Sequence, residues 1–178
     1  KGEIVAQNNE EAIENYRKAE LLGSSSAICN IAHCYANGLG FDQNLTKAIE
    51  LYEKAGSLGC SNAYYNIALI YTNGRPGIEK DYKKAMLYAN KAANLGNSFA
   101  FFLIGIFFEE ALGVPEDKET AFNFYKKSAE LANPEALYKV GLCYENGYFV
   151  AKDLNEASKY YQKAFDLGFN KNKKKKSK

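Results

Sequence analysis

Small and apolar residues recur along this chain with a regular period. The alanines that mark it are Ala12, Ala48, Ala85, Ala121 and Ala157, spaced 36, 37, 36 and 36 residues apart. Counted from each alanine, offset +4 is aromatic in four of the five copies, while offset +7 is small and offset +10 is leucine in all five. Offsets 0, +3 or +4, +7 and +10 or +11 trace one face of a helix with 3.6 residues per turn. Each copy therefore predicts a helix of about a dozen residues, called helix A below.

A second helix, called helix B, is predicted in each complete copy from offset +15, which is alanine in all four. Its residues are apolar almost all round, as in Ala100–Phe108, which is typical of a helix buried between neighbours. Glycine at offset +11 favours the left-handed conformation that ends helix A. An Asx residue stands four positions before each later alanine, where it can cap the next helix A. These capping residues are Asn44, Asp81, Asp117 and Asp153.

The pattern predicts an all-α protein: an α/α superhelix, or solenoid, of antiparallel helix pairs with repeats of 36–37 residues. The first ten residues are expected to end a truncated preceding repeat, and the last eight to form a disordered Lys-rich tail. A lone helix A of a fifth repeat is expected before that tail. In order, the expected segments are 1–10, repeats at 11–46, 47–83, 84–119 and 120–155, the lone helix at 156–170 and the tail at 171–178.

This pattern resembles the Sel-one-like repeat (SLR) family, whose tetratricopeptide-like α/α repeats stack into solenoids. The second repeat carries the family motif almost intact, as Ala48, Tyr52, Ala55, Gly59, Ala63, Ala68, Tyr71 and Gly74. The period also fits this family better than the 34 residues of tetratricopeptide repeats. The third repeat departs most, with Ala89 in place of tyrosine and Ala111 in place of glycine, which makes its packing and exit loop uncertain. The resemblance implies a right-handed solenoid whose A helices line a concave face, and a scaffold or adaptor that binds partner protein segments there.

Composition narrows the possible functions. Residues 171–178 hold six of the 23 basic residues, so residues 1–170 carry 17 basic against 21 acidic residues, a net charge of −4. That body is not expected to bind nucleic acid through bulk charge. No apolar run reaches the roughly 20 residues of a membrane span. The single histidine and the four cysteines match no catalytic or metal-binding motif, so we expect no enzymatic activity, catalytic residue, metal or cofactor.

Two alternatives to the scaffold remain open. One is a β-lactamase-like hydrolase of the cysteine-rich kind, and the other is a purely structural segment of a larger polypeptide or complex. The cysteine-rich relatives carry a regular cysteine pair in each repeat, a pattern that Cys29, Cys34, Cys60 and Cys143 do not form. We therefore expect free thiols, which favour a reducing compartment such as the cytoplasm, although the parent protein could be secretory.

Candidate partner-binding residues lie at the exposed offsets of helix A. Lysine stands at offset +6 in all five copies, which predicts either a ladder of cationic donors or lysines whose stems pack on the preceding aromatic residue. Asparagine suits the main chain of an extended peptide and lysine suits carboxylates, so we expect an acidic or C-terminal peptide at the centre of the array. Leu87 predicts either an apolar contact with the partner or packing on a neighbouring helix. The candidate residues are Leu87, Asn90, Lys91, Asn94, Lys126 and Lys127.

Overall fold

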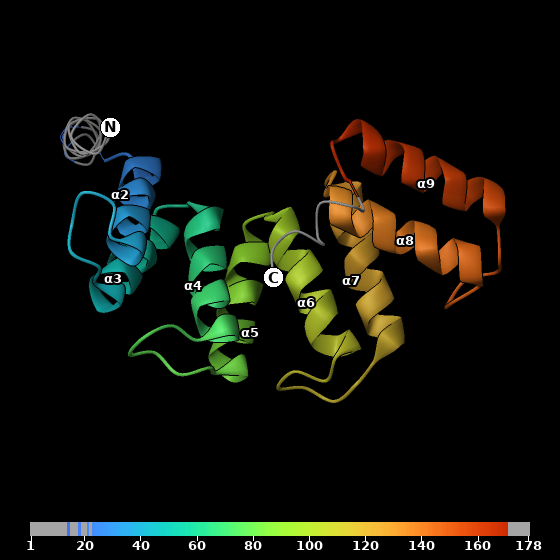
Figure 1. Cartoon of the computed structure of the whole chain (residues 1–178), viewed down its shortest axis with the longest axis horizontal. Coiled ribbons are helices and arrows are strands. Elements are labelled where there is room, and N and C mark those ends of the chain that lie inside the picture. The colour runs from blue at the N-terminus through green and yellow to red at the C-terminus, as the bar shows by residue number, and fades with distance from the viewer. Residues whose placement is uncertain (1–13, 15–17, 19–20, 22, 171–178) are drawn as a thin grey trace. The chain divides into compact units, whose positions relative to one another are not determined.

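The computed structural model describes residues 14, 18, 21 and 23–170, and this part consists of helices joined by loops (Figure 1). Its helices are α2 (Ser25–Asn37), α3 (Leu45–Ser57), α4 (Ser61–Asn73), α5 (Tyr82–Asn94), α6 (Ser98–Glu109), α7 (Lys118–Glu130), α8 (Pro134–Asn146) and α9 (Leu154–Asp166). The expected all-α class is confirmed. The partial repeat expected at 1–10 and the tail expected at 171–178 lie outside the described residues.

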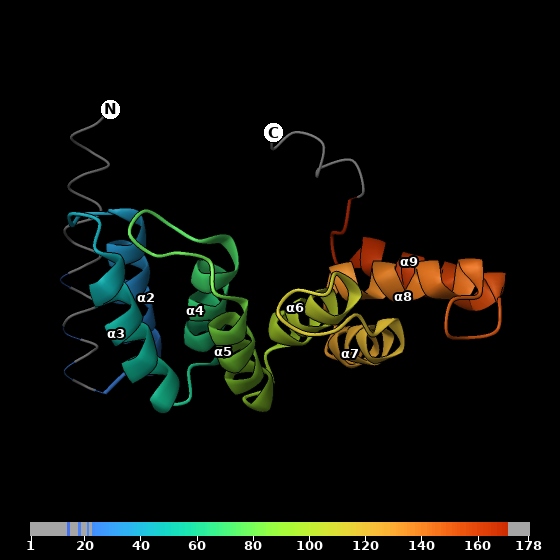
Figure 2. The same cartoon turned by 90° about the horizontal axis from the view of Figure 1, so that it is seen from below.

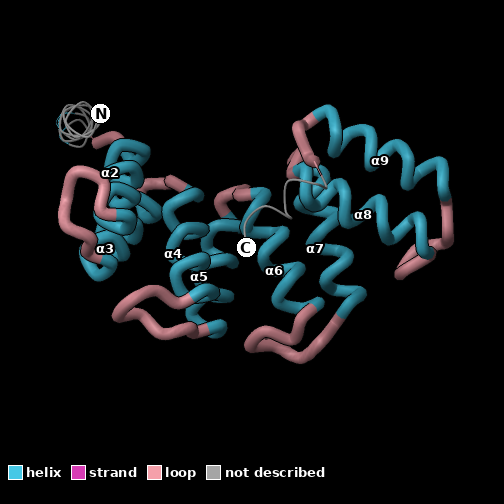
Figure 3. Tube along the Cα trace, in the orientation of Figure 1, coloured by secondary structure: helices cyan, strands magenta, loops and turns pink. Residues whose placement is uncertain are grey.

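The helices alternate between the two predicted kinds. Helices α3, α5, α7 and α9 are the A helices, and α2, α4, α6 and α8 are the B helices. The predicted Asx residues are their N-caps: for example, the Asn44 side chain accepts from the Lys47 N–H, and the Asp117 side chain accepts from the Thr120 N–H. Long loops lead from helix B to the next helix A, as at 38–44 and 147–153, whereas the turns from A to B, such as 58–60, are short (Figure 3).

The chain forms two compact units, Lys1–Asn97 and Ser98–Lys178. In the first unit, α2 packs on α3, α3 on α4 and α4 on α5, and Ile28, Tyr52 and Ile67 are buried at the centre of its core. In the second unit, α6 packs on α7, α7 on α8 and α8 on α9. The last two lie side by side in Figures 1 and 2, and buried Tyr125 and Val140 belong to this core.

Glycine residues allow helix B to pack closely against the next helix A. A Cβ atom added at Gly105 in α6 would lie 2.5 Å from the ring of Tyr125 in α7, and one at Gly141 would lie 2.7 Å from the ring of Tyr161. Real Cβ atoms do not approach this closely, so these glycines set the spacing of the helices. Offset +20 therefore controls the packing between successive repeats in the second unit.

In the third repeat, the two unusual residues keep the burial and the turn expected at their positions. Ala89, which replaces tyrosine, is completely buried in α5. The neighbouring Tyr88 supplies an aromatic ring, which stacks on Tyr71 with 6.0 Å between ring centroids. Ala111 has a φ of 54°, so it takes the left-handed conformation that Gly38 and Gly147 take after α2 and α8. The fold thus tolerates both substitutions.

Ala132 is expected to be a site where glycine stabilises the protein. It follows α7 with a φ of 59°, at the offset where Gly59, Gly96 and Gly168 have positive φ. Because the Cβ of an L-residue is strained in this region, Ala132→Gly is expected to raise the free energy of unfolding by about 1 kcal/mol. Urea-induced unfolding measures the change. In the matched control, Ala151→Gly in an ordinary loop conformation, added freedom of the unfolded chain should instead lower stability by several tenths of a kcal/mol.

Candidate partner-binding surface

The sequence-predicted binding residues fall on two A helices. Leu87, Asn90, Lys91 and Asn94 lie on α5 in the first unit, and Lys126 and Lys127 lie on α7 in the second; all six are exposed. We call these six side chains the A-helix surface. The two groups belong to different units.

On α5, Lys91 lies over aromatic rings. Its Nζ is 5.0 Å from the ring centroid of Tyr88 and 5.3 Å from that of Tyr64 in α4. The Tyr88 hydroxyl donates a hydrogen bond to Glu53 on α3, so three helices contribute to this part of the surface. A cation over an exposed ring contributes about 0.5–1 kcal/mol, enough to restrict the lysine side chain while leaving its ammonium accessible.

The same arrangement recurs in the second unit. The Nζ of Lys127 lies 5.6 Å from the Phe124 ring centroid, and that ring stacks on Phe108 of α6. On α9, the Nζ of Lys163 lies 5.9 Å from the ring centroid of Tyr160. These contacts support the second interpretation of the lysine ladder, packing on a preceding aromatic residue. The aromatic residues Tyr88, Phe124 and Tyr160 at offset +3 were not among the predicted residues, although each stands three positions before one of the last three lysines of the ladder.

Asn90 and Leu87 add a polar and an apolar side chain to the surface of α5. The Asn90 Nδ2 donates a 3.0 Å hydrogen bond to the Met86 carbonyl, so its Oδ1 and its second amide hydrogen are the groups that it can offer to a partner. Leu87 is 53% exposed, so about half of its surface is accessible to a partner. The surface of α5 therefore combines an apolar side chain with polar ones.

The surface of α5 is basic. The helix carries Lys83, Lys84 and Lys91 and has no acidic residue within its bounds. At its start, a hydrogen bond from the Lys84 backbone N–H holds the pKa of Asp81 below its usual value, and the Lys84 ammonium lies 3.5 Å from that carboxylate. Lys91, near the other end, has its ammonium above rings and offers the charge that a carboxylate would meet.

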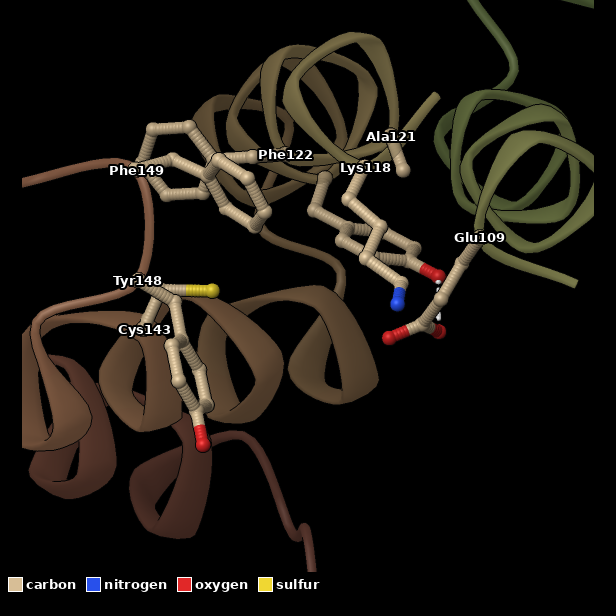
Figure 4. Close-up of a pocket in the computed structure, with 8 residues that line it drawn as sticks. Glu109, Lys118, Ala121, Phe122, Cys143, Tyr148 and Phe149 are labelled. Atoms are coloured by element: carbon tan, nitrogen blue, oxygen red, sulfur yellow. Dashed lines mark hydrogen bonds between the residues drawn. The ribbon is translucent and has the colours of Figure 1, made fainter. Parts of the chain in front are cut away.

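A cavity of about 370 Å³ in the second unit was not predicted from the sequence (Figure 4). It lies among the end of α6, the first half of α7, and α8 with its following loop. Its charged side chains are Glu109 and Lys118, and the rest of its lining is largely aromatic. The lining residues are Glu109, Lys118, Ala121, Phe122, Tyr125, Cys143, Tyr148 and Phe149.

The histidine and the cysteines offer little reactive chemistry, although Cys29 and Cys60 lie close together. His33 is exposed on α2, with the Asn37 side-chain amide 3.3 Å from its ring. Burial and the nearby Cys60 thiol raise the pKa of Cys29 to about 12, and burial also raises the pKa of Cys34 and Cys143. Raised thiol pKa values disfavour a nucleophilic thiolate. Within the described ranges, no three metal-ligating side chains gather, and no helix has the length and apolar character to span a bilayer.

Comparison with known families gives one repeat model that matches along the chain. The model of the Sel1 repeat matches residues 1–24, 25–60, 61–97, 100–133 and 134–169. From residue 25 on, the matched segments start with or just inside a B helix, half a repeat out of phase with units that begin at helix A. A comparison with curated proteins finds no match.

Solved structures share the fold. A Sel1 repeat protein from Oxalobacter formigenes matches with a TM-score of 0.82 and 27% identity, over 90% of this chain and 65% of its own. The protective antigen c5321 of uropathogenic Escherichia coli, which displays an SLR fold, matches with a TM-score of 0.72 and 28% identity, over 88% of this chain and 34% of its own. Helicobacter pylori cysteine rich protein B matches with a TM-score of 0.58 and 26% identity, over 72% of this chain and 91% of its own. The expected fold class, a solenoid of α/α repeats, is confirmed.

Proposed function

This chain belongs to the Sel1 repeat family, and from that premise we propose that it is a scaffold or adaptor that binds an acidic segment of a protein partner on its A-helix surface. Repeats of this family typically serve protein–protein interaction, which sets the class of function. The residues and the partner chemistry come from the surface of this chain. The partner-binding residues remain those predicted from the sequence: Leu87, Asn90, Lys91, Asn94, Lys126 and Lys127.

The observation that carries the proposal is the basic, partly aromatic surface of α5. Lys91 is restrained above Tyr64 and Tyr88, so less side-chain freedom is lost when a carboxylate binds it. Exposed Leu87 adds an apolar contact, and the side-chain amide of Asn94 can both donate to and accept from a peptide main chain. An extended acidic segment or a C-terminal carboxylate complements these groups.

The test removes charge and keeps packing. Lys91→Met with Lys127→Met should weaken the binding of an acidic partner segment by about 1–3 kcal/mol, the scale of hydrogen bonds to charged groups. The partner is first captured with the unmodified chain and identified, and its isolated segment is then titrated by calorimetry at two salt concentrations. The affinity for the unmodified chain should fall with added salt.

A matched control carries Lys80→Met and Lys152→Met, which remove two exposed lysines in loops, outside α5 and α7. This control should bind the segment within twofold of the unmodified chain. Equal affinity of the Lys91/Lys127 variant and the unmodified chain would show that the partner binds elsewhere, and the exposed faces of the B helices would be tested next.

A further inference from the structure

The cavity of the second unit has an aromatic lining and one charged end. The rings of Phe122, Tyr125, Tyr148 and Phe149 line it, and Glu109 stands at the end of α6 (Figure 4). Its volume of about 370 Å³ is in the range of cavities that hold a small molecule or one large side chain. None of its lining residues belongs to the A-helix surface.

Glu109 is an ionised acceptor with capacity to spare. Burial alone would raise its pKa, but hydrogen bonds from Lys139 and Tyr125 outweigh burial and hold that pKa below its usual value. Its Oε2 accepts from the Tyr125 hydroxyl and the Lys139 ammonium, both at 2.7 Å, and its Oε1 accepts from Lys139 at 2.9 Å. Because each carboxylate oxygen can accept two hydrogen bonds, Oε1 can take one more donor.

Phe149 forms one wall of the cavity in a strained conformation. Its φ is 61°, in the left-handed region where a bulky residue is an outlier. The corresponding residues of the first and third repeats are Gly40 and Gly113, with φ values of 71° and 72°. The Phe149 ring packs 6.4 Å from that of Phe122 while half of the residue stays exposed. Strained residues of this kind concentrate at ligand-binding sites.

The first unit has a cavity at the equivalent place, and the chain's own arginine lines it. A shift of 73 residues relates Ala36, Tyr52, Ile70 and Arg75 to Glu109, Tyr125, Cys143 and Tyr148. The Arg75 guanidinium donates to the Ala36 carbonyl at 3.0 Å and to the Asn37 Oδ1 at 3.4 Å, and the cavity there measures about 200 Å³. In the second unit, tyrosine replaces the arginine and a carboxylate replaces Ala36.

We propose that the cavity of the second unit binds the arginine side chain of a partner protein. A planar guanidinium stacks on aromatic rings and bonds well to a carboxylate, and this cavity is lined by four rings and has the Glu109 carboxylate at one end (Figure 4). Two cations stand nearby: Lys139 is bound to Glu109, and Lys118 is paired with Glu116 at 2.5 Å. Because Lys139 already shares Glu109, the rings contribute much of the selectivity, and they favour a weakly hydrated guanidinium over an ammonium.

The experiment titrates the full chain, labelled with nitrogen-15, with three blocked pentapeptides, each with four glycines around one central residue. That residue is arginine, lysine or citrulline, the last being the neutral counterpart of arginine. The arginine peptide should shift the backbone amides of Cys143, Tyr148 and Phe149 and bind at least tenfold more tightly than the other two. Equal binding of arginine and citrulline, or shifts confined to other regions, would overturn the proposal.

Two variants and a control separate recognition from folding. Glu109→Gln should reduce the affinity for the arginine peptide at least tenfold, whereas Glu130→Gln on the exposed surface of α7 should leave it unchanged. Tyr148→Arg keeps Glu109 paired with Lys139 and introduces the residue type found at the equivalent position of the first unit. The new guanidinium should occupy the cavity and so prevent the peptide from binding. Unchanged binding in either Glu109→Gln or Tyr148→Arg contradicts the proposal. The proposed function stands or fails separately, because the Lys91/Lys127 variant tests a different surface and partner chemistry.

Discussion

Replacing Phe107 with alanine is expected to lower the free energy of unfolding by about 3–5 kcal/mol. Phe107 lies in α6 with none of its surface exposed. The loss combines the transfer of a large apolar side chain with the cavity that remains when the surrounding helices relax only in part. Its counterparts at the same offset are the smaller Cys34, Ile70 and Cys143. The Phe107 ring therefore fills more space than the side chain at this offset fills in the other repeats.

The second unit offers a matched control for this prediction. Phe165 on α9 is 70% exposed, and Phe165→Ala should change the free energy of unfolding by less than about 0.5 kcal/mol. Urea unfolding followed by far-ultraviolet circular dichroism gives both values, provided that the slopes of the transitions agree. A loss of under about 1 kcal/mol for Phe107→Ala would contradict the packing described for α6.

Gly105→Ala is expected to lower the free energy of unfolding by about 1–3 kcal/mol, the usual effect of overpacking. The direction is informative, since alanine at an ordinary helix position is about 1 kcal/mol more favourable than glycine. Here the added Cβ would lie 2.5 Å from the Tyr125 ring and 3.2 Å from the Ala121 carbonyl oxygen. Either the ring or the whole of α7 must then move.

A double-mutant cycle assigns this loss to its cause. In a Tyr125→Ala background the ring is absent, so the added methyl group should cost much less or even stabilise α6 through helix propensity. Alanine is already present at this offset in α5, as Ala89, so the background variant has a precedent in the chain. If Gly105→Ala destabilises equally in both backgrounds, the clash with the Ala121 carbonyl, and not the ring, sets the spacing.

Much of the fold was predictable because its signals depend on residues close together in the sequence and recur in each repeat. The caps at Asn44, Asp81, Asp117 and Asp153 depend on residues within a few positions, and the repeat displays each signal several times. The left-handed conformation of Ala111 was harder to predict, because the repeat pattern has glycine at this position. In the structure the loop around it retains the turn without glycine.

The sites were harder to predict because they join distant positions. Glu109, Tyr125 and Lys139 come from three helices, and only the packing of α6, α7 and α8 shows that two donors meet one carboxylate. The sequence placed Lys91 on an exposed helix face, but not over a tyrosine from another helix as well as its own. The conformation of Phe149 contradicts the preference of its residue type, so no residue-by-residue pattern could predict it.

The close contact of Gly105 with Tyr125, and of Gly141 with Tyr161, bears on how such a chain can grow by duplication. Each helix A has its N-cap in the loop before it, so a copied segment brings its own solution for the helix start. The glycine and the tyrosine, in contrast, lie in successive repeats. A crossover between them would place the glycine against a different residue of another repeat, or place the tyrosine ring against a side chain bulkier than glycine. Exchange of repeats is therefore compatible with the fold only when each junction keeps a small residue facing the ring.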